Sequence, residues 1–236
     1  MNIRLYHPDS IVENSTNLLS KEHTHYITNV MRLKRGSIIN LFNNEGEWES
    51  EIVFLDKDRV EVKFLKKIKG SQKKNKIELA ICIVKKTPME TILQKATELG
   101  VSKIIPIISE RTEIKELNNK RAKKIVIEAT EQSSQMSPPE ILKITKLKDF
   151  LKNLDETTQL LFADVNSKDK LSFEKFKNFK SLCILIGPEG DFSPSERQSI
   201  LSFAQVVPFT MSKNILRSDT AVISAISLVN FINNYP

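Results

Sequence analysis

The sequence has 236 residues, of which 40% are hydrophobic and 28% charged; this composition predicts a globular protein with one large core or two smaller ones, and nothing in it argues for disorder. No window approaches the roughly 18 apolar residues that cross a bilayer, and residues 1–10 lack the apolar stretch of a secretory signal, so we expect a cytoplasmic protein. The formal net charge of +7 is weak evidence for a polyanionic partner.

The cysteines and histidines argue against a metal site. Cys82 and Cys183 each lie inside an apolar run, which favours buried, reduced thiols over a disulfide or metal ligands. Two of the three histidines stand together in the His-Thr-His of residues 23–25, and no plausible zinc ligand set results.

Basic residues gather in three runs, at residues 31–36, 66–76 and 115–124. Each run alone is typical of a solvated surface or a linker. Three of them in one chain favour a nucleic-acid partner.

The N-terminal part, residues 1–70, predicts a small β domain. Apolar segments between residues 37 and 67 are separated by turn signals, Asn-Asn-Glu-Gly at 43–46 and Asp-Lys-Asp-Arg at 56–59. The lysine-rich stretch 68–76, which contains glycine and serine and has no apolar period, is typical of a linker. We therefore place a second domain at residues 71–236.

The second domain alternates predicted strands and helices. The expected strands are 77–84, 101–109, 158–165, 181–186 and 205–210, and the expected helices are 87–100, 118–135, 170–179, 193–204 and 218–233. Because the strands are continuous apolar strings between helices, they predict a parallel sheet covered on both faces, and the fold class is α/β.

The helix predicted at 87–100 has recognisable start and stop signals. Thr87 is the expected cap, with Pro88 at the first helical position and Glu90 completing a capping box. Gly100 is expected to end this helix.

The stretch LCILIGPEGDFSPSE, Leu182–Glu196, runs from an apolar strand into a Gly-Pro-Glu-Gly turn and then into a helix with Ser193 as its cap. Gly187 and Gly190 remove side chains and permit positive φ, so this loop can bring backbone donors and acceptors close to a flat ligand at the carboxyl end of the sheet. A Gly-Pro loop alone is more often just a tight turn. It lacks the signatures of a phosphate-binding P-loop and of a dinucleotide site, which disfavours both ligands.

The stretch MSKNILRSDTAVISAI, Met211–Ile226, leads from a strand into the terminal helix. Arg217 stands directly before Ser218, an expected helix cap, and Asp219 lies in the first turn. One side of the helix is strongly apolar, so it is buried either in the core or against a second subunit. We favour a homodimer, with the core as the alternative.

Four of these motifs, KATELGV, EQSSQMSPPEI, LIGPEGDFSPSE and ILRSDTA, occur in register over the chain. Together they resemble the bacterial small-subunit ribosomal RNA uridine-N3 methyltransferase family, of the SPOUT class of S-adenosylmethionine-dependent enzymes. The N-terminal β domain is similar to the PUA-like RNA-binding domain of that family, with HYITNVMRLKRG matching its opening signature. The resemblance covers essentially the whole chain.

The resemblance implies a trefoil knot in the second domain, with S-adenosylmethionine bound in the knotted loops at a homodimer interface. It implies a uridine of 16S ribosomal RNA in the small subunit as the substrate. The cofactor-binding residues carried over by position are Leu161, Phe162, Ala163, Ile186, Gly187, Pro188, Glu189, Gly190, Met211, Asn214, Ile215, Leu216 and Arg217.

Methylation of N3 is a demanding in-line displacement, because this nitrogen is protonated at neutral pH. Arg217, at a helix N-terminus, is suited to stabilise the charge that spreads onto the uracil carbonyl oxygens. Glu189 and Asp219 are candidates to remove the proton. The alternatives are a helix-dipole partner for Asp219 and a loop-bracing carboxylate for Glu189.

The expected RNA contacts fall in both domains. They are Arg4, Arg32, Lys34 and Arg35 in the first, and Glu131, Gln132 and Ser133 in the second. Tyr6, Tyr26 and Trp48 could stack on bases or belong to the core, while the core is the better assignment for Phe42.

The chain departs from the family pattern at several positions. Asp191 replaces a glycine, Ser218-Asp219 replaces Thr-Glu, Gln135 and Asn214 replace arginines, and Met211-Ser212 replaces Leu-Gly. Asp enters left-handed conformations readily, so Asp191 is tolerable, whereas lost arginines weaken phosphate contacts. These departures keep two alternatives open: a non-catalytic RNA-binding ribosome-assembly factor, and a SPOUT enzyme with another base or ribose target.

Overall fold

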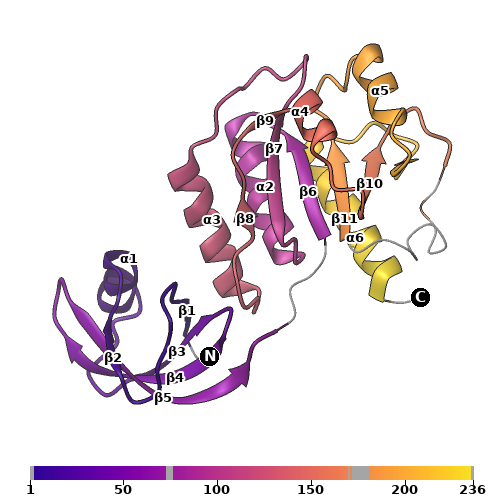
Figure 1. Ribbon diagram of the computed structural model, residues 1–236. Helices are drawn as coiled ribbons and strands as arrows, with labels where there is room; N and C mark the ends of the chain where they lie inside the picture. Colours follow the sequence, from indigo (N-terminus) through magenta and orange to yellow (C-terminus); the bar gives the residue numbers. More distant parts are fainter. Residues whose placement is uncertain (1–2, 73–76, 170, 172–180, 235–236) are drawn as a thin grey trace. The chain divides into compact units, whose positions relative to one another are not determined.

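A computed structural model describes residues 3–72, 77–169, 171 and 181–234. The chain divides into two compact units (Figure 1). Unit 1 comprises Met1–Lys73 and Thr130–Ser137, and unit 2 comprises Lys74–Ala129 and Pro138–Pro236. None of the helices in the described ranges is long and apolar enough to span a membrane.

Unit 1 is built on a five-stranded sheet with the order β1-β3-β4-β5-β2. The strands are β1 (Arg4–Tyr6), β2 (Thr16–Leu18), β3 (Ile38–Asn43), β4 (Gly46–Leu55) and β5 (Val60–Gly70). Only the β1–β3 pair is parallel, and register shifts between β4 and β5 interrupt their ladder. The hairpin between β3 and β4 needs a glycine at position 46, because a Cβ there would lie 2.6 Å from the Lys69 carbonyl oxygen.

Phe42 is buried in unit 1, as predicted. Trp48 is buried there as well, whereas the sequence had left open that it stacks on RNA bases. A short helix α1 (Lys21–His25) and a π-helical turn (Tyr26–Val30) also belong to this unit. The sequence predicted only strands here, which was wrong for these residues. The Ser20 hydroxyl caps α1 by accepting a hydrogen bond from His23 N at 3.1 Å.

Two segments differ from the predicted domain division. β5 continues to Gly70, so the start of the predicted linker is a strand, and residues 73–76 of that linker lie outside the described residues. Thr130–Ser137, predicted in the second domain, packs in unit 1. There the Arg4 guanidinium donates to the Gln135 carbonyl oxygen at 2.7 Å, and Glu131 Oε1 accepts from Tyr6 N at 2.9 Å.

Unit 2 is an α/β unit around a seven-stranded sheet, as predicted, with the order β12-β10-β11-β6-β7-β8 and with β9 also on β7. The strands are β6 (Ile77–Cys82), β7 (Lys103–Ile108), β8 (Glu140–Ile141), β9 (Thr145–Lys146), β10 (Thr158–Ala163), β11 (Ser181–Ile186) and β12 (Val206–Phe209). All pairs are parallel; Ile184 of β11, for example, lies opposite Leu161 on one side and Leu79 on the other.

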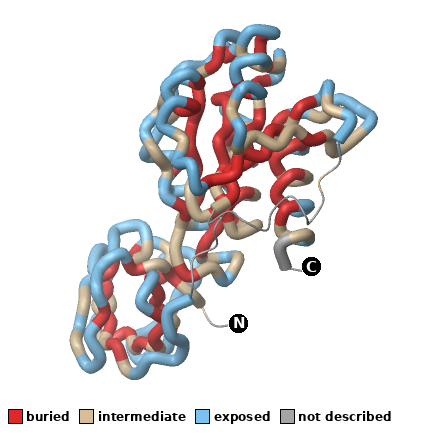
Figure 2. Tube along the Cα trace, turned by 45° about the vertical axis from the view of Figure 1, so that its right-hand side comes forward, coloured by how far each residue is buried: buried red, intermediate tan, exposed pale blue. Residues whose placement is uncertain are grey.

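Within the described residues, five helices accompany the sheet: α2 (Lys86–Glu98), α3 (Asn119–Gln132), α4 (Leu147–Lys152), α5 (Pro194–Leu201) and α6 (Ser218–Asn234). Alternate residues of β6 enter two cores. Leu79 and Ile81 pack with α2 and α6, whereas Ala80 and Cys82 pack with α4 and α5. The central strands are therefore almost continuously buried (Figure 2), which confirms a sheet covered on both faces.

The apolar side of α6 is buried in the first of these cores through Val222, Ala225, Ile226 and Val229. Burial in the core, which the sequence left open as the alternative to a second subunit, therefore explains why this side of α6 is apolar. Leu228 remains exposed on the other side.

Two capping predictions have different outcomes. The Ser193 capping box with Glu196 is confirmed, with Pro194 at the start of α5. The box at Thr87 was wrong: α2 begins at Lys86, and Glu90 instead accepts hydrogen bonds from Arg121 at 2.9 and 3.3 Å. The predicted helix 170–179 lies outside the described residues, apart from residue 171.

Both cysteines are buried free thiols, as predicted. Burial raises the pKa of Cys82 to about 12 and raises the pKa of Cys183 as well. The described residues contain no group of His, Cys, Asp and Glu side chains arranged to bind a metal ion.

Candidate functional site

A cavity of about 230 Å³ lies where three neighbouring strands of unit 2 end. β12, β10 and β11 are parallel neighbours, so their carboxyl ends meet at one edge of the sheet. The cavity is lined by the strand ends and the loops after them, at residues 163–165, 186–189, 191, 209–212 and 214–217, and by the start of α6. We call it the strand-end cavity. It occupies the position at which open parallel sheets bind ligands.

The loop after β11 is shaped by Phe192. A Cβ on Gly187 would lie 3.0 Å from the Phe192 ring, which packs edge-on against Phe162 with 5.6 Å between ring centroids. Neither Gly187 nor Gly190 uses the positive φ that a glycine permits. Asp191 does so instead, with φ of 57°, and its Oδ1 accepts a hydrogen bond from Phe192 N at 2.8 Å.

An ion pair fixes the wall formed after β10. Asp164 is buried, and its carboxylate accepts hydrogen bonds from Arg197 of α5 at 2.7 to 3.2 Å. Burial alone would raise the pKa of the Asp164 carboxyl, but the hydrogen bonds from Arg197 and Asn166 outweigh it and lower that pKa. The carboxylate therefore stays charged and ties α5 to the end of β10.

The loop after β12 leads directly into α6. The Arg217 carbonyl oxygen accepts from Ala221 N at 2.8 Å, so Arg217 occupies the capping position and Ser218 is the first helical residue. Ser218 was therefore wrongly predicted as the cap; its hydroxyl points to the Gly187 carbonyl oxygen, 3.5 Å away. Ile215 in this loop is 89% exposed.

Most of the residues predicted to bind a cofactor line the strand-end cavity: Ala163, Ile186, Gly187, Pro188, Glu189, Met211, Asn214, Ile215, Leu216 and Arg217. Leu161 and Phe162 do not; both are buried in the cores on opposite faces of the sheet, because successive strand residues point to opposite sides. Gly190 lines a second cavity instead.

The sequence missed several lining residues: Asp164, Val165, Asp191, Phe209, Thr210, Ser212, Ser218 and Ala221. A usable signal existed for Asp164, a single carboxylate directly after a buried strand.

Of the predicted catalytic residues, Arg217 and Glu189 are exposed and line the strand-end cavity. Asp219 is not among the lining residues, and its Oδ1 accepts from Thr220 N at 2.8 Å in the first turn of α6. The structure therefore brings Arg217 and Glu189 to one cavity and leaves Asp219 beside it. Their catalytic roles stay predictions.

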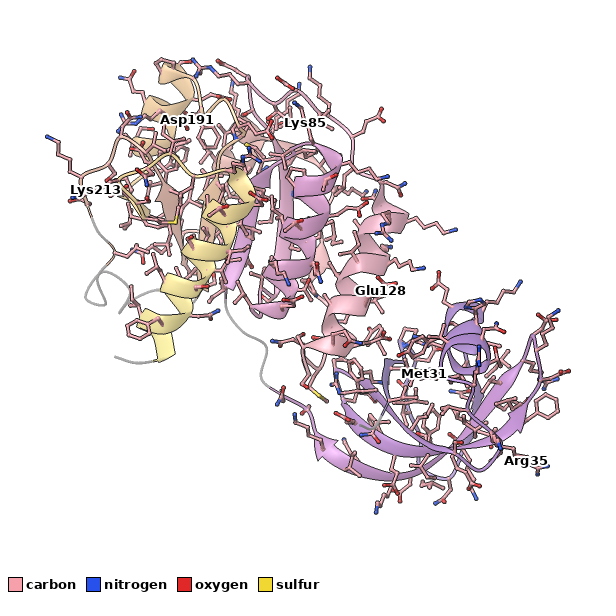
Figure 3. The ribbon with its side chains drawn as sticks, turned by 180° about the vertical axis from the view of Figure 1, so that it is seen from behind. Met31, Arg35, Lys85, Glu128, Asp191 and Lys213 are labelled. Atoms are coloured by element: carbon pink, nitrogen blue, oxygen red, sulfur yellow. The ribbon has the colours of Figure 1, made fainter. Side chains whose placement is uncertain are left out.

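The predicted RNA contacts of unit 1 separate into two groups. Arg32, Lys34 and Arg35 are exposed between the π-helical turn Tyr26–Val30 and β3, where Figure 3 labels Arg35. Arg4 has a structural role instead: its side chain is 12% exposed, donates to Glu47 at 2.9 Å and lies 3.4 Å from the Phe42 ring centroid. Most of its donors are thus engaged within the unit, which argues against a phosphate contact.

The predicted face Glu131–Ser133 is likewise mostly occupied. Glu131 Oε1 accepts from His23 Nε2 at 3.0 Å as well as from Tyr6 N. The Ser133 hydroxyl oxygen is buried. Only Gln132 of these residues is exposed.

Comparison with known proteins agrees with this architecture. The family model of the RNA methyltransferase domain matches residues 70–230, and that of the RNA methyltransferase PUA domain matches residues 19–65. Ribosomal RNA small subunit methyltransferase E of Rickettsia conorii is 33% identical, over 98% of this chain and 96% of the relative. The protein of the same name from Buchnera aphidicola of Schizaphis graminum is also 33% identical, over 89% and 87%.

A solved structure is similar over the same length. Ribosomal RNA small subunit methyltransferase E from Neisseria gonorrhoeae, bound to S-adenosyl methionine, superimposes with a TM-score of 0.89 at 28% identity and covers 98% of each chain. The match of the methyltransferase model to more than half of the sequence is decisive for the family. This chain belongs to the RNA methyltransferase family and carries its PUA domain.

Proposed function

We propose that this protein uses S-adenosylmethionine to methylate N3 of a uridine in 16S ribosomal RNA of the small ribosomal subunit. The observation that carries the proposal is the strand-end cavity, which the loops of an RNA methyltransferase domain build at the carboxyl ends of β10, β11 and β12. A relative of the same fold has S-adenosyl methionine bound. The N3 target follows from the resemblance of the four sequence motifs.

The residues of the strand-end cavity fit S-adenosylmethionine. The loops that line the cavity offer backbone donors and acceptors, and Met211, Ile215 and Leu216 offer apolar surface for an adenine ring. Ile215 is largely exposed, so a ligand that covers it removes apolar surface from water. When bound, S-adenosylmethionine supplies a methyl group on a positively charged sulfur.

We assign the uracil chemistry to Glu189 and Arg217, which line this same cavity. The Glu189 carboxylate accepts the N3 proton. The Arg217 guanidinium stabilises the negative charge that then spreads onto the flanking carbonyl oxygens. Asp219 stays at the helix start, where its charge and its hydrogen bond to Thr220 N favour α6.

The exposed Arg32, Lys34 and Arg35 support an RNA-binding role for the PUA-like domain, proposed at residues 1–70. Phosphate contacts from these side chains fix the position of the RNA without reading its sequence. The methyltransferase domain, proposed at residues 71–236, then uses this binding energy to place the uridine, so free uridine is expected to be a poor substrate.

We also propose a cytoplasmic homodimer. The exposed apolar side chains Leu228 of α6 and Ile215 of the preceding loop support an interface on this part of unit 2. Sedimentation equilibrium measures the mass directly. A single species at the 27.0 kDa of one chain, at micromolar concentration, contradicts the dimer.

The activity is tested with purified protein, small ribosomal subunits and labelled S-adenosylmethionine, followed by mass spectrometry of the digested nucleosides. We expect 3-methyluridine. Methylation of a ribose or of another base position refutes the N3 target. If the protein binds the RNA but neither S-adenosylhomocysteine nor S-adenosylmethionine, the non-catalytic alternative holds.

The matched variants are Arg217→Ala and Lys213→Ala. Both side chains are exposed in the same loop, but only Arg217 lines the strand-end cavity. We expect Arg217→Ala to keep the fold, by circular dichroism, and to lose methylation by about 10²-fold or more, the typical effect of removing one charge-stabilising donor. Lys213→Ala keeps wild-type turnover. Equal rates for the two variants would refute the role of Arg217.

A further inference from the structure

A second cavity, of about 190 Å³, lies beside the first at the same edge of the sheet. The residues that follow β6, β7 and β11 line it, and β11 is the strand that both cavities share. Pro188 and Glu189 line both cavities, so the loop after β11 is a common wall. Figure 3 labels Asp191 and Lys85 at this end of unit 2.

The second cavity differs from the first in its charge. Lys85 and Arg111 contribute two cations, and Glu113 and Glu189 contribute two carboxylates. Lys85 is exposed at the N-terminus of α2, which has no side-chain cap, so backbone N–H groups add to the positive potential there. Arg111 Nη1 donates to the Gly190 carbonyl oxygen at 2.9 Å, and a guanidinium retains further donors.

A methyl transfer needs its acceptor directly beside its donor. In the proposed function the methyl donor occupies the strand-end cavity. The uridine that accepts the methyl group must therefore approach beside one of the loops that line this cavity. The second cavity meets this requirement because it shares Glu189, the group assigned to the N3 proton. RNA carries phosphodiesters, which arginine binds through two parallel hydrogen bonds and lysine binds as a point charge.

We propose that the second cavity binds the RNA at the methylated uridine, with Lys85 and Arg111 contacting one phosphodiester of that nucleotide or its neighbour. This inference rests on the proposed function. The carboxylates of Glu113 and Glu189 repel further phosphates, so a single phosphate is bound and the base is left beside Glu189. Arg111 is also a positioning residue, since its hydrogen bond to Gly190 holds the shared loop.

The test compares Lys85→Gln with Lys86→Gln. The two lysines are adjacent and exposed, but only Lys85 lines the second cavity. Affinity for a 16S ribosomal RNA transcript is measured over a range of salt concentrations with S-adenosylhomocysteine present. For Lys85→Gln the slope of log K against log salt becomes shallower by about 0.7, the loss of one single-strand phosphate contact, and KM for RNA rises. Lys86→Gln changes neither quantity.

Three results overturn the proposal: an unchanged slope in Lys85→Gln, equal losses in both variants, or a lowered affinity of Lys85→Gln for S-adenosylhomocysteine by calorimetry. The last result would place the donor, not RNA, beside Lys85. Failure of the proposed function is distinguishable, because then the wild-type protein itself neither binds S-adenosylhomocysteine nor methylates RNA.

Arg111→Lys supplies an independent check. Lysine keeps the charge but not the fork of donors, so the hydrogen bond to Gly190 is weakened while the phosphate contact remains. We expect the affinity for S-adenosylhomocysteine to fall and the salt slope to stay as in the wild type. A changed slope with unchanged affinity for S-adenosylhomocysteine contradicts the positioning role.

Discussion

Gly187→Ala tests how the loop after β11 is packed. The added Cβ would lie 3.0 Å from Phe192 Cε2 and 3.2 Å from Cδ2, whereas carbon atoms pack comfortably at about 3.5–4.0 Å. The ring cannot move freely, because Phe192 is buried and packs against Phe162. The substitution therefore forces either the ring or the loop to shift.

The magnitude follows from two opposing effects. Overpacking of this kind costs about 1–3 kcal/mol, and replacing glycine by alanine restores about 0.4–1 kcal/mol by restricting the unfolded chain. We expect a net destabilisation of about 1–2 kcal/mol. For a chain of this size each kcal/mol corresponds to about 2–4 °C in Tm.

Gly190→Ala is the matched control. A Cβ there meets Arg111 at 3.8 Å, an ordinary contact, and Gly190 has no positive φ. Its Tm should equal or slightly exceed that of the wild type. Thermal unfolding followed by circular dichroism gives Tm, and calorimetry with S-adenosylhomocysteine gives the affinity, which we expect to fall only in Gly187→Ala. Equal Tm values for the two variants would refute the packing argument.

Three further substitutions separate structural from functional charges. Asp164→Asn leaves Arg197 without its carboxylate and should destabilise unit 2 by about 1–3 kcal/mol in urea unfolding, less than a fully buried pair because Arg197 is partly exposed. Because the pKa of Asp164 is lower in the folded than in the unfolded state, its charge stabilises the folded protein at pH values above the unfolded-state pKa. This stabilisation is lost as the pH falls through the folded-state pKa. In Asp164→Asn, the stability should therefore depend less on pH in the acid range. Arg4→Ala should lower the stability of unit 1, reported by the fluorescence of Trp48, the one tryptophan in the sequence, because the Glu47 carboxylate loses its ion-pair partner and retains the hydrogen bond from Asn40. Arg35→Ala should leave that stability unchanged and weaken RNA binding, and the opposite pattern for the two arginines would contradict their assignments.

The sheet and the Ser193 cap could be predicted because their signals are local. The run LCILI of β11, Leu182–Ile186, is apolar at every position, as expected of a strand covered on both faces, and the capping box lies within four consecutive residues. Strands of two residues, β8 and β9, carry no period that a sequence pattern can reveal.

The predictions failed where contacts between residues far apart in the sequence determine the local structure. Glu90 pairs with Arg121, and this tertiary contact is invisible in the local capping pattern at Thr87. Arg4 looked like a surface cation, but its partners Glu47 and Gln135 come from far along the chain. Leu161 and Phe162 were placed in the site by position, but their side chains pack in the cores on the two faces of the sheet and do not line the strand-end cavity.

The most direct test of the central claim is a crystal structure of the protein grown with S-adenosylhomocysteine. We predict ligand density in the strand-end cavity, against Ala163, Gly187 and Leu216. Density for the ligand elsewhere on the chain, or none at saturating concentration, would contradict it.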